Sequence, residues 1–249
     1  MNKMKTLITL ALVFFLATNV EAQVKKPAPK KPTTQKAPVK KPVVKPTANA
    51  PRQIRVPGVR IKVITDSGVM VIRLYDKTPQ HRDNFIKLAN AHFFDSLLFH
   101  RVIQGFMIQG GDPQSKYAQP GEMLGNGDVG YTIPAEFDTS LIHKKGALAA
   151  ARTNNPAKAS SGCQFYIVQG NKYTDADLNN YEMSRGVKYS AAQRNLYKTI
   201  GGTPMLDMNY TVFGEVESGL NVIDKIASVQ KDGSDRPLGN VHMYIEVIK

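Results

Sequence analysis

Cysteine is nearly absent from this chain of 249 residues, which contains only Cys163. No disulfide can therefore form within the chain, and a hydrophobic core has to stabilise its folded part; a hydrophobic content of 42% is sufficient for one. No neighbour in the sequence would convert the Cys163 thiol to a thiolate. We therefore interpret Cys163 as a small residue of a strand.

Acidic residues are nearly absent from the N-terminal part of the chain. Residues 1–55 contain 12 of the 33 basic residues but only one acid, Glu21, which leaves 21 basic against 19 acidic residues for positions 56–249. Most of the net charge of +13 thus belongs to the N-terminal part. A nucleic-acid-binding fold carries its basic residues as a patch on a folded surface, so this distribution argues against a nucleic-acid partner.

A hydrophobic run long enough to span a membrane is also missing. The run Leu7 to Ala17 has 11 residues, whereas a membrane-spanning helix needs roughly 20. Lysines precede this run, and small residues at Val20 and Ala22 follow it at the positions that a signal peptidase reads. We predict a signal peptide at residues 1–22 rather than a permanent anchor. Export is expected, to a bacterial periplasm first and secretion as the alternative.

Residues 23–57 form a Lys/Pro-rich segment with eight lysines between positions 25 and 45. Proline removes backbone donors and the lysines repel one another, so we predict a disordered linker that precedes one folded domain at residues 58–249. Two roles remain open for this linker. It is either a stalk, or a contact with an anionic envelope surface that weakens as salt rises.

The stretch Phe99 to Pro113 organises the folded domain. It predicts a short strand, a glycine-containing turn and a second strand, in which Arg101 and Gln109 interrupt an otherwise apolar pattern. From Phe99 to Asp112 this stretch resembles the core motif of the cyclophilins, a family of peptidyl-prolyl cis-trans isomerases. The resemblance places four residues in the family's proline pocket: Arg101, Phe106, Met107 and Gln109.

Two further blocks carry the same resemblance, residues 146–168 and residues 205–216. They imply six more substrate-binding residues: Ala151, Arg152, Gln164, Tyr166, Leu206 and Tyr210. Arg152, Tyr166 and Tyr210 depart from the commonest residues of the family. A buried Tyr166 hydroxyl would need a partner, which leaves its depth in the pocket open. Because Met205, Met208 and Tyr210 change the rim of the pocket, we expect weak binding of cyclosporin.

The resemblance implies the fold and the chemistry. The fold would be mainly β, a closed eight-stranded antiparallel barrel capped by two helices with a helical insertion at about residues 171–204. The activity would be peptidyl-prolyl isomerisation in proline-containing polypeptides, without cofactor or metal, by a chain expected to be a monomer. Arg101 would donate to the prolyl nitrogen, Gln109 would orient Arg101, and Gln164 with the backbone of Ala151 and Arg152 would hold the peptide.

Local patterns agree with this arrangement. Strands are predicted at residues 59–65, 69–74 and 241–247, a helix that begins with Thr78 as cap and Pro79 in its first turn, and a second helix at residues 219–227. Residues 113–134 read as a glycine-rich surface loop without the features of a phosphate-binding loop. Glu136 and Asp138 lack the further ligands of a metal site.

The insertion contains two capping patterns, Thr174 with Asp177 and Ser190 with Gln193, and each predicts the start of a short helix. It is either a decorated loop packed on the barrel or a part that grips substrate or a partner. The whole domain also leaves one rival to the enzyme, a non-catalytic chaperone or scaffold that binds proline-containing peptides. The intact Arg101, Gln109 and Gln164 argue for the enzyme.

Overall fold

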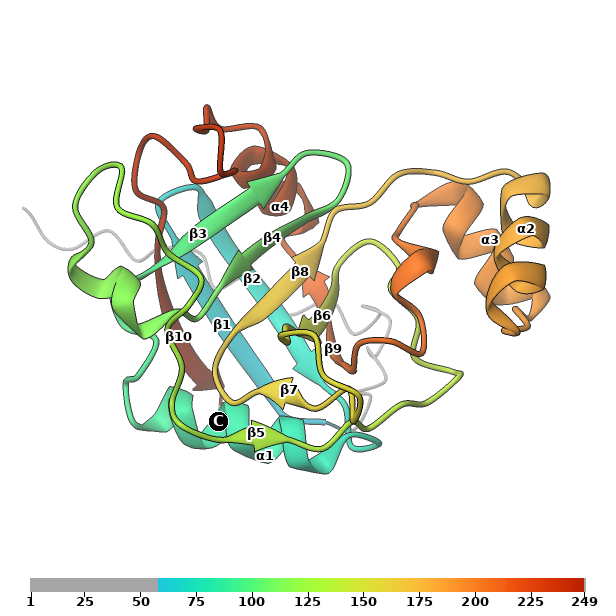
Figure 1. The fold of residues 1–249 in the computed structure, drawn as a ribbon, viewed down its shortest axis with the longest axis horizontal. Helices are drawn as coiled ribbons and strands as arrows, with labels where there is room; N and C mark the ends of the chain where they lie inside the picture. The colour runs from blue at the N-terminus through green and yellow to red at the C-terminus, as the bar shows by residue number, and fades with distance from the viewer. Residues whose placement is uncertain (1–57, 249) are drawn as a thin grey trace, which may run out of the picture. The chain divides into compact units, whose positions relative to one another are not determined.

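The computed structural model describes residues 58–248, which belong to one compact unit (Figure 1). The predicted signal peptide and linker lie outside the described residues. Residues 58–248 contain ten strands: β1 (Arg60–Thr65), β2 (Gly68–Leu74), β3 (Leu97–Ile103), β4 (Met107–Gly110), β5 (Thr132–Ile133), β6 (Ala147–Ala150), β7 (Ser160–Ser161), β8 (Phe165–Val168), β9 (Val212–Ser218) and β10 (His242–Ile248). The helices are α1 (Pro79–Asn90), α2 (Asp175–Arg185), α3 (Ala191–Thr199) and α4 (Leu220–Ala227), with 3-10 turns η1 (Pro113–Tyr117) and η2 (Pro204–Leu206).

Eight of these strands close into the predicted antiparallel barrel, in the order β1, β10, β3, β4, β8, β6, β9, β2. Two pairs of consecutive strands, β1–β2 and β3–β4, are joined by tight turns, and Thr65 opposite Gly68 closes the β1–β2 hairpin. Closure matters because it leaves none of the eight strands with an unpaired edge. The two remaining short strands, β5 and β7, pair with each other in a separate sheet.

Helices α1 and α4 close the two ends of the barrel (Figure 1). Phe85, Leu88 and Ala89 of α1 and an apolar face of α4 pack into the same buried cluster as the inward side chains of the strands. Phe165 lies within this cluster, with its ring 5.3 Å from that of Phe85 and 5.7 Å from that of Phe94. Burial of this apolar cluster is the main stabilising contribution in a chain that cannot form a disulfide.

A β-bulge in β3 determines which way Arg101 points. Phe99 pairs with Gly110 and Arg101 pairs with Gln109, so two residues of β3 oppose one residue of β4. His100 is the extra residue. In a regular strand without the bulge, Arg101 would continue the inward alternation of Leu97 and Phe99; because of the bulge, Arg101 is exposed and Val102 is buried in the core.

One part of the barrel is apolar on its outer face as well. Met107, Ala149, Tyr166 and Val212 form a second cluster, separate from the core, on the outside of β4, β6, β8 and β9. The strand sequences ALAA and FYIV are therefore buried on both faces. An apolar outer face on an antiparallel barrel indicates a binding surface or a covered surface.

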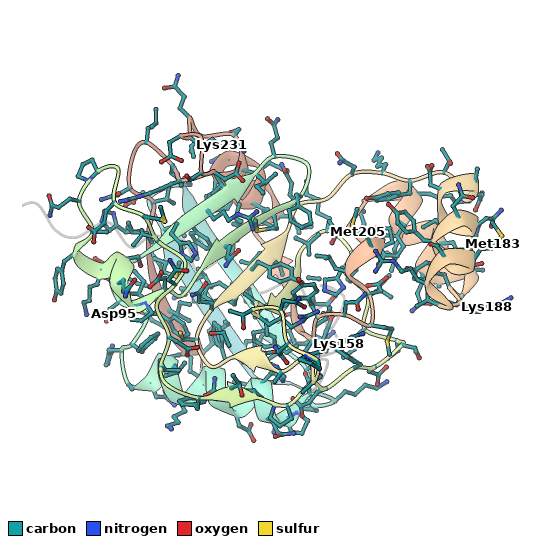
Figure 2. All side chains as sticks on the ribbon, viewed as in Figure 1. Asp95, Lys158, Met183, Lys188, Met205 and Lys231 are labelled. Atoms are coloured by element: carbon teal, nitrogen blue, oxygen red, sulfur yellow. The ribbon has the colours of Figure 1, made fainter. Side chains whose placement is uncertain are left out.

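Helices α2 and α3 belong to the insertion and extend away from the barrel (Figure 1). Both begin with the predicted capping boxes, at Thr174 and at Ser190, and α2 ends at Gly186 in the left-handed conformation. Met183 and Lys188 lie at the end of the insertion that is farthest from the barrel (Figure 2). Leu178 of α2 and Tyr197 of α3 pack with Ile142 in a small buried cluster.

Three local predictions are corrected by the structure. Thr78 precedes α1, but its side chain makes no cap; the carboxylate of Glu136 instead accepts from the backbone N–H groups of Gln80 and His81 at 3.1 and 3.0 Å. Cys163 lies in a bend between β7 and β8, not in a strand. The predicted loop at residues 113–134 contains η1 and β5, because Asp112 caps η1 through the N–H of Gln114.

Within residues 58–248, no helix is both long and apolar enough to cross a membrane.

The same residues contain no group of three or more potential metal ligands. Glu136 is engaged with His81, whose Nδ1 lies 2.7 Å from its carboxylate. Burial alone would raise the pKa of Glu136, but the hydrogen bonds from His81 outweigh it and lower that pKa.

Candidate active site

An open pocket of 220 Å³ lies on the apolar outer face of the barrel. We call it the Arg101 pocket. It brings together nine of the ten residues that the sequence predicted, from three strands and three connecting segments, and they are Arg101, Phe106, Met107, Gln109, Ala151, Arg152, Tyr166, Leu206 and Tyr210. The tenth, Gln164, stands behind the pocket, where it bonds to Gln109.

Arg101 is one of the two arginines that line this pocket. Its side chain is 44% exposed, and Nε lies 3.8 Å from a carboxylate oxygen of Asp235, which also pairs with Lys231 at 2.5 Å. The contact with Asp235 is too long for a hydrogen bond, so the guanidinium donors are free to meet a ligand. A guanidinium remains protonated at any working pH and presents its donors in a rigid fork.

Gln109 and Gln164 form a relay of amides beside Arg101. Nε2 of Gln164 donates to the carbonyls of Gly125 and Gly127 at 3.0 and 2.8 Å, and its Oε1 accepts from Nε2 of Gln109 at 3.0 Å. This order leaves Oε1 of Gln109 without a hydrogen bond among the described residues. Gln109 is the cross-strand neighbour of Arg101, but its amide bonds to Gln164 and not to the guanidinium.

The walls of the pocket are apolar. Phe106 comes from the turn between β3 and β4, which Gly105 allows through a φ of 75°. Met107 follows on β4, and Leu206 closes the opposite side from η2. Tyr210 stands with its ring edge toward Tyr166, at 5.9 Å between centroids. Such walls fit a compact apolar ring and bury it from water.

Tyr166 forms the floor of the pocket and is 4% exposed. The structure answers the question of its hydroxyl group, which lies 3.0 Å from Nε2 of His143. Burial raises the pKa of Tyr166 well above its ordinary value, so the hydroxyl keeps its proton. The Tyr166 ring can therefore face the pocket while its polar end is satisfied behind it.

Backbone groups at the rim come from Ala151 and Arg152, but only those of Arg152 are free. The N–H of Ala151 donates to Gln164 and its carbonyl accepts from Ser161. The N–H and carbonyl of Arg152 bond to no other residue within 58–248. The Arg152 side chain donates to the carbonyl of Asn209 at 3.0 Å and lies over the Tyr210 ring at 4.6 Å.

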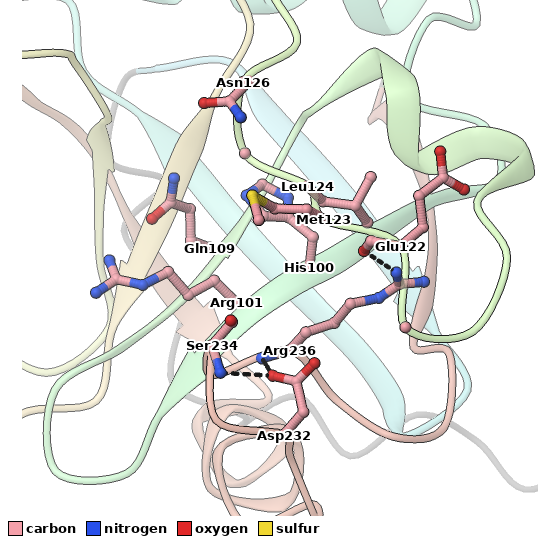
Figure 3. Close-up of a pocket in the computed structure, with 12 residues that line it drawn as sticks. His100, Arg101, Gln109, Glu122, Met123, Leu124, Asn126, Asp232, Ser234 and Arg236 are labelled. Carbon is pink, nitrogen blue, oxygen red and sulfur yellow. Dashed lines mark hydrogen bonds between the residues drawn. The ribbon is translucent and has the colours of Figure 1, made fainter.

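A second pocket, of 340 Å³, adjoins the first and shares Arg101 and Gln109 with it. We call it the His100 pocket. Figure 3 shows Arg101 and Gln109 on one side of it and Glu122 and Arg236 on the other, where Arg236 donates to the Glu122 carbonyl. The two pockets together provide a continuous surface on both sides of the Arg101 guanidinium.

Three residues of this region were not predicted from the sequence: Asp235, His143 and Asp207. Asp235 lies 134 positions after Arg101, and His143 lies outside the three blocks of resemblance. Asp207 lies inside the third block, next to Leu206, but no local pattern marks its side chain as buried. Only their position in space joins them to the site.

Cys163 takes no part in the pocket. It is buried, and burial raises the pKa of its thiol to about 11. A thiol with so high a pKa remains protonated at neutral pH, which agrees with the absence of a nucleophilic role.

Comparison with known families gives one extended match. Residues 60–247 match the family described as cyclophilin type peptidyl-prolyl cis-trans isomerase/CLD. A putative peptidyl-prolyl cis-trans isomerase of Staphylococcus haemolyticus is 32% identical over 184 residues, which cover 74% of this chain and 87% of that protein. A putative bifunctional phosphatase/peptidyl-prolyl cis-trans isomerase of Streptococcus pyogenes is 35% identical, and the match spans 38% of its length and 77% of this chain.

Solved structures show the same fold. A crystal structure of a cyclophilin type peptidyl-prolyl cis-trans isomerase of Cryptosporidium parvum superposes with a TM-score of 0.58 at 21% identity, over 77% of this chain and 98% of that one. The same protein crystallised in the presence of the dipeptide Ala-Pro gives a TM-score of 0.55. The likeness confirms the predicted barrel with its two capping helices.

Proposed function

Because this chain belongs to the family of cyclophilin-type peptidyl-prolyl cis-trans isomerases, we propose that the Arg101 pocket holds the proline and Arg101 catalyses rotation of the X-Pro bond. The family defines the activity, and the arrangement of the side chains supports the roles. The observation that carries the proposal is the convergence of a compact apolar cavity and a guanidinium that makes no hydrogen bond to any residue within 58–248.

Rotation about an X-Pro bond is opposed by amide resonance, with a barrier of about 18–20 kcal/mol. At the top of the barrier the amide is twisted, and the prolyl nitrogen has a lone pair that a fixed donor can meet. The Arg101 guanidinium supplies that donor, so it stabilises the twisted state more than the planar one. No covalent bond is made or broken.

The remaining residues hold the two sides of the bond. Phe106, Met107, Leu206 and Tyr166 keep the proline ring fixed in the cavity. The free Oε1 of Gln109 accepts from a peptide N–H or from Arg101, and the free backbone groups of Arg152 pair with the peptide. Ala151 contributes its packing, since its own backbone groups are already bonded.

The activity is tested by NMR exchange spectroscopy on a short peptide with a single Ala-Pro bond. The uncatalysed bond isomerises over tens to hundreds of seconds, and a catalytic amount of the protein is expected to bring exchange into the range of seconds or faster. Peptide binding with an unchanged exchange rate would instead support the non-catalytic chaperone or scaffold.

We propose further that the substrates are exported polypeptides. The support is the sequence of residues 1–22, which has the charge, the short apolar run and the small residues of a signal peptide. Intact-mass measurement on protein purified from the native cell envelope is expected to show a chain that begins near Gln23. A mass that still includes Met1 would contradict export by this route.

A further inference from the structure

A chain of buried hydrogen bonds connects the floor of the Arg101 pocket to the insertion. It runs from Tyr166 through His143 to Asp207, and from Asp207 to Tyr189 and Tyr197. We call these five residues the Asp207 network. His143 and Tyr197 are fully buried, and Asp207 is 6% exposed.

The carboxylate of Asp207 is the centre of this network. One of its oxygens accepts from the backbone N–H of His143 and faces Nδ1 of the same residue, both at 2.8 Å. The other oxygen accepts from the hydroxyls of Tyr197 at 2.5 Å and Tyr189 at 2.9 Å. Two of these four donors therefore come from the insertion. A buried carboxylate needs such donors, because its desolvation is otherwise costly.

With a neutral His143, the Asp207 network has one consistent order of protons. A carboxylate accepts hydrogen bonds, so the proton of a neutral His143 lies on Nδ1 and Nε2 is left as an acceptor. The Tyr166 hydroxyl must then donate to Nε2. Burial raises the pKa of both Tyr166 and Tyr197, which keeps the two hydroxyls as donors.

Asp207 also fixes the second wall of the pocket. It directly follows Leu206, and its backbone N–H donates to Pro204 at the start of η2. The insertion returns to the barrel at Gly202, where a Cβ would lie 2.3 Å from the His143 carbonyl and 2.6 Å from the Tyr197 ring. This close approach leaves no room for a side chain at position 202, so the contact between the insertion and the barrel requires glycine there.

We infer that the insertion sets the geometry of the Arg101 pocket, with His143, Asp207, Tyr189 and Tyr197 as positioning residues for Tyr166 and Leu206. This inference rests on the proposed function of the pocket. The floor and one wall of the cavity then depend on hydrogen-bond donors from the insertion, Tyr197 of α3 and Tyr189 just before its N-cap. The insertion is therefore neither a loose decoration nor a separate module.

The test compares two single hydroxyl deletions in the insertion, Tyr197→Phe and Tyr173→Phe. Tyr173 is the matched control, because its ring contacts those of Tyr181 and Tyr197 but its hydroxyl bonds to no other described residue. Two quantities are measured on the full chain: the affinity for an Ala-Pro peptide by NMR titration, and the ring resonances of Tyr166 in the free protein. Neither needs turnover, so a failure of catalysis and a failure of positioning give different results.

Tyr197→Phe is expected to shift the Tyr166 ring resonances and to weaken peptide binding about five- to tenfold, with Tyr173→Phe close to wild type. If catalysis is present, KM rises by this factor while kcat changes less, because pocket walls act on bound substrate and transition state alike. Adding Tyr166→Phe to Tyr197→Phe should weaken peptide binding only slightly further, since both changes interrupt the same series of hydrogen bonds.

Equal peptide affinities and equal Tyr166 resonances in the two variants would overturn the inference. A loss of stability in Tyr197→Phe, measured by urea unfolding, without a change in affinity or resonance would overturn it as well. Asp207→Asn provides a second variant. It keeps the shape but replaces an acceptor by a donor, and it is expected to weaken binding more than Tyr197→Phe.

Discussion

Replacing Arg101 by alanine is expected to lower kcat and kcat/KM about 100-fold each, with little change in KM. Removal of one fixed donor that acts only in the transition state has effects of this size. The guanidinium donates to the prolyl nitrogen only when the amide is twisted, so the planar substrate loses little binding affinity in the variant. The measurement is NMR exchange on an Ala-Pro peptide at several peptide concentrations.

Two controls make this result specific. Arg185→Ala removes an exposed arginine at the end of α2 and should leave the rate unchanged. Arg101→Lys keeps the charge but loses the rigid fork, and we expect it to recover only a small part of the activity. A wild-type rate in Arg101→Ala would show that the pocket works without this donor and would contradict the catalytic role of Arg101.

Acidification from pH 7 to pH 4 is expected to cost about 3 kcal/mol of stability through His100 alone. Burial in the bulge of β3 lowers the pKa of this histidine from 6.5 to about 4, with Asp112 opposing the shift and Arg101 and Arg236 adding to it. As pH falls below about 6.5, His100 therefore binds a proton in the unfolded chain, whereas in the folded chain it stays neutral until pH approaches 4. Stability is fully present above that pH and declines until pH falls through the folded pKa near 4.

Urea unfolding at pH 7, 5.5 and 4 measures this contribution. His100→Leu removes the titrating group and so loses none of this stability on acidification. The free energy of unfolding of the variant, relative to that of wild type, should therefore rise by about 3 kcal/mol between pH 7 and pH 4. His92→Asn is the matched control, because His92 is exposed at the end of α1 and asparagine tolerates its positive φ. A gap between His100→Leu and wild type that is constant with pH would contradict the prediction.

The order of the elements could be predicted from local patterns. Pro79 in the first turn of α1, the two capping boxes and the Asp66-Ser67 turn act over three or four residues, and the structure has each helix and strand at those places. The capping of α1 could not be predicted, because its acceptor is Glu136, more than fifty positions away. Local signals specify where an element begins, and long-range contacts decide which atoms satisfy its end.

The set of site residues was predicted by resemblance, and their working geometry was not. Nine of the ten line one pocket, but Gln109 bonds to Gln164 rather than to Arg101, and Ala151 has no backbone group to spare. The ten roles themselves remain predictions for the experiments above. Which donor meets which acceptor depends on the distances between strands, and a sequence motif does not contain those distances.

The closed barrel, the two capping helices, the insertion and the nine side chains that line the Arg101 pocket could all be predicted from the sequence and its resemblance. Where those side chains point depends on the tertiary structure. The alternation of β3 alone would turn Arg101 into the core, and the extra residue His100 turns it out. The Asp207 network likewise joins residues 143, 166, 189, 197 and 207. Burial makes each unpaired polar group costly, so the fold brings together partners that no local pattern links.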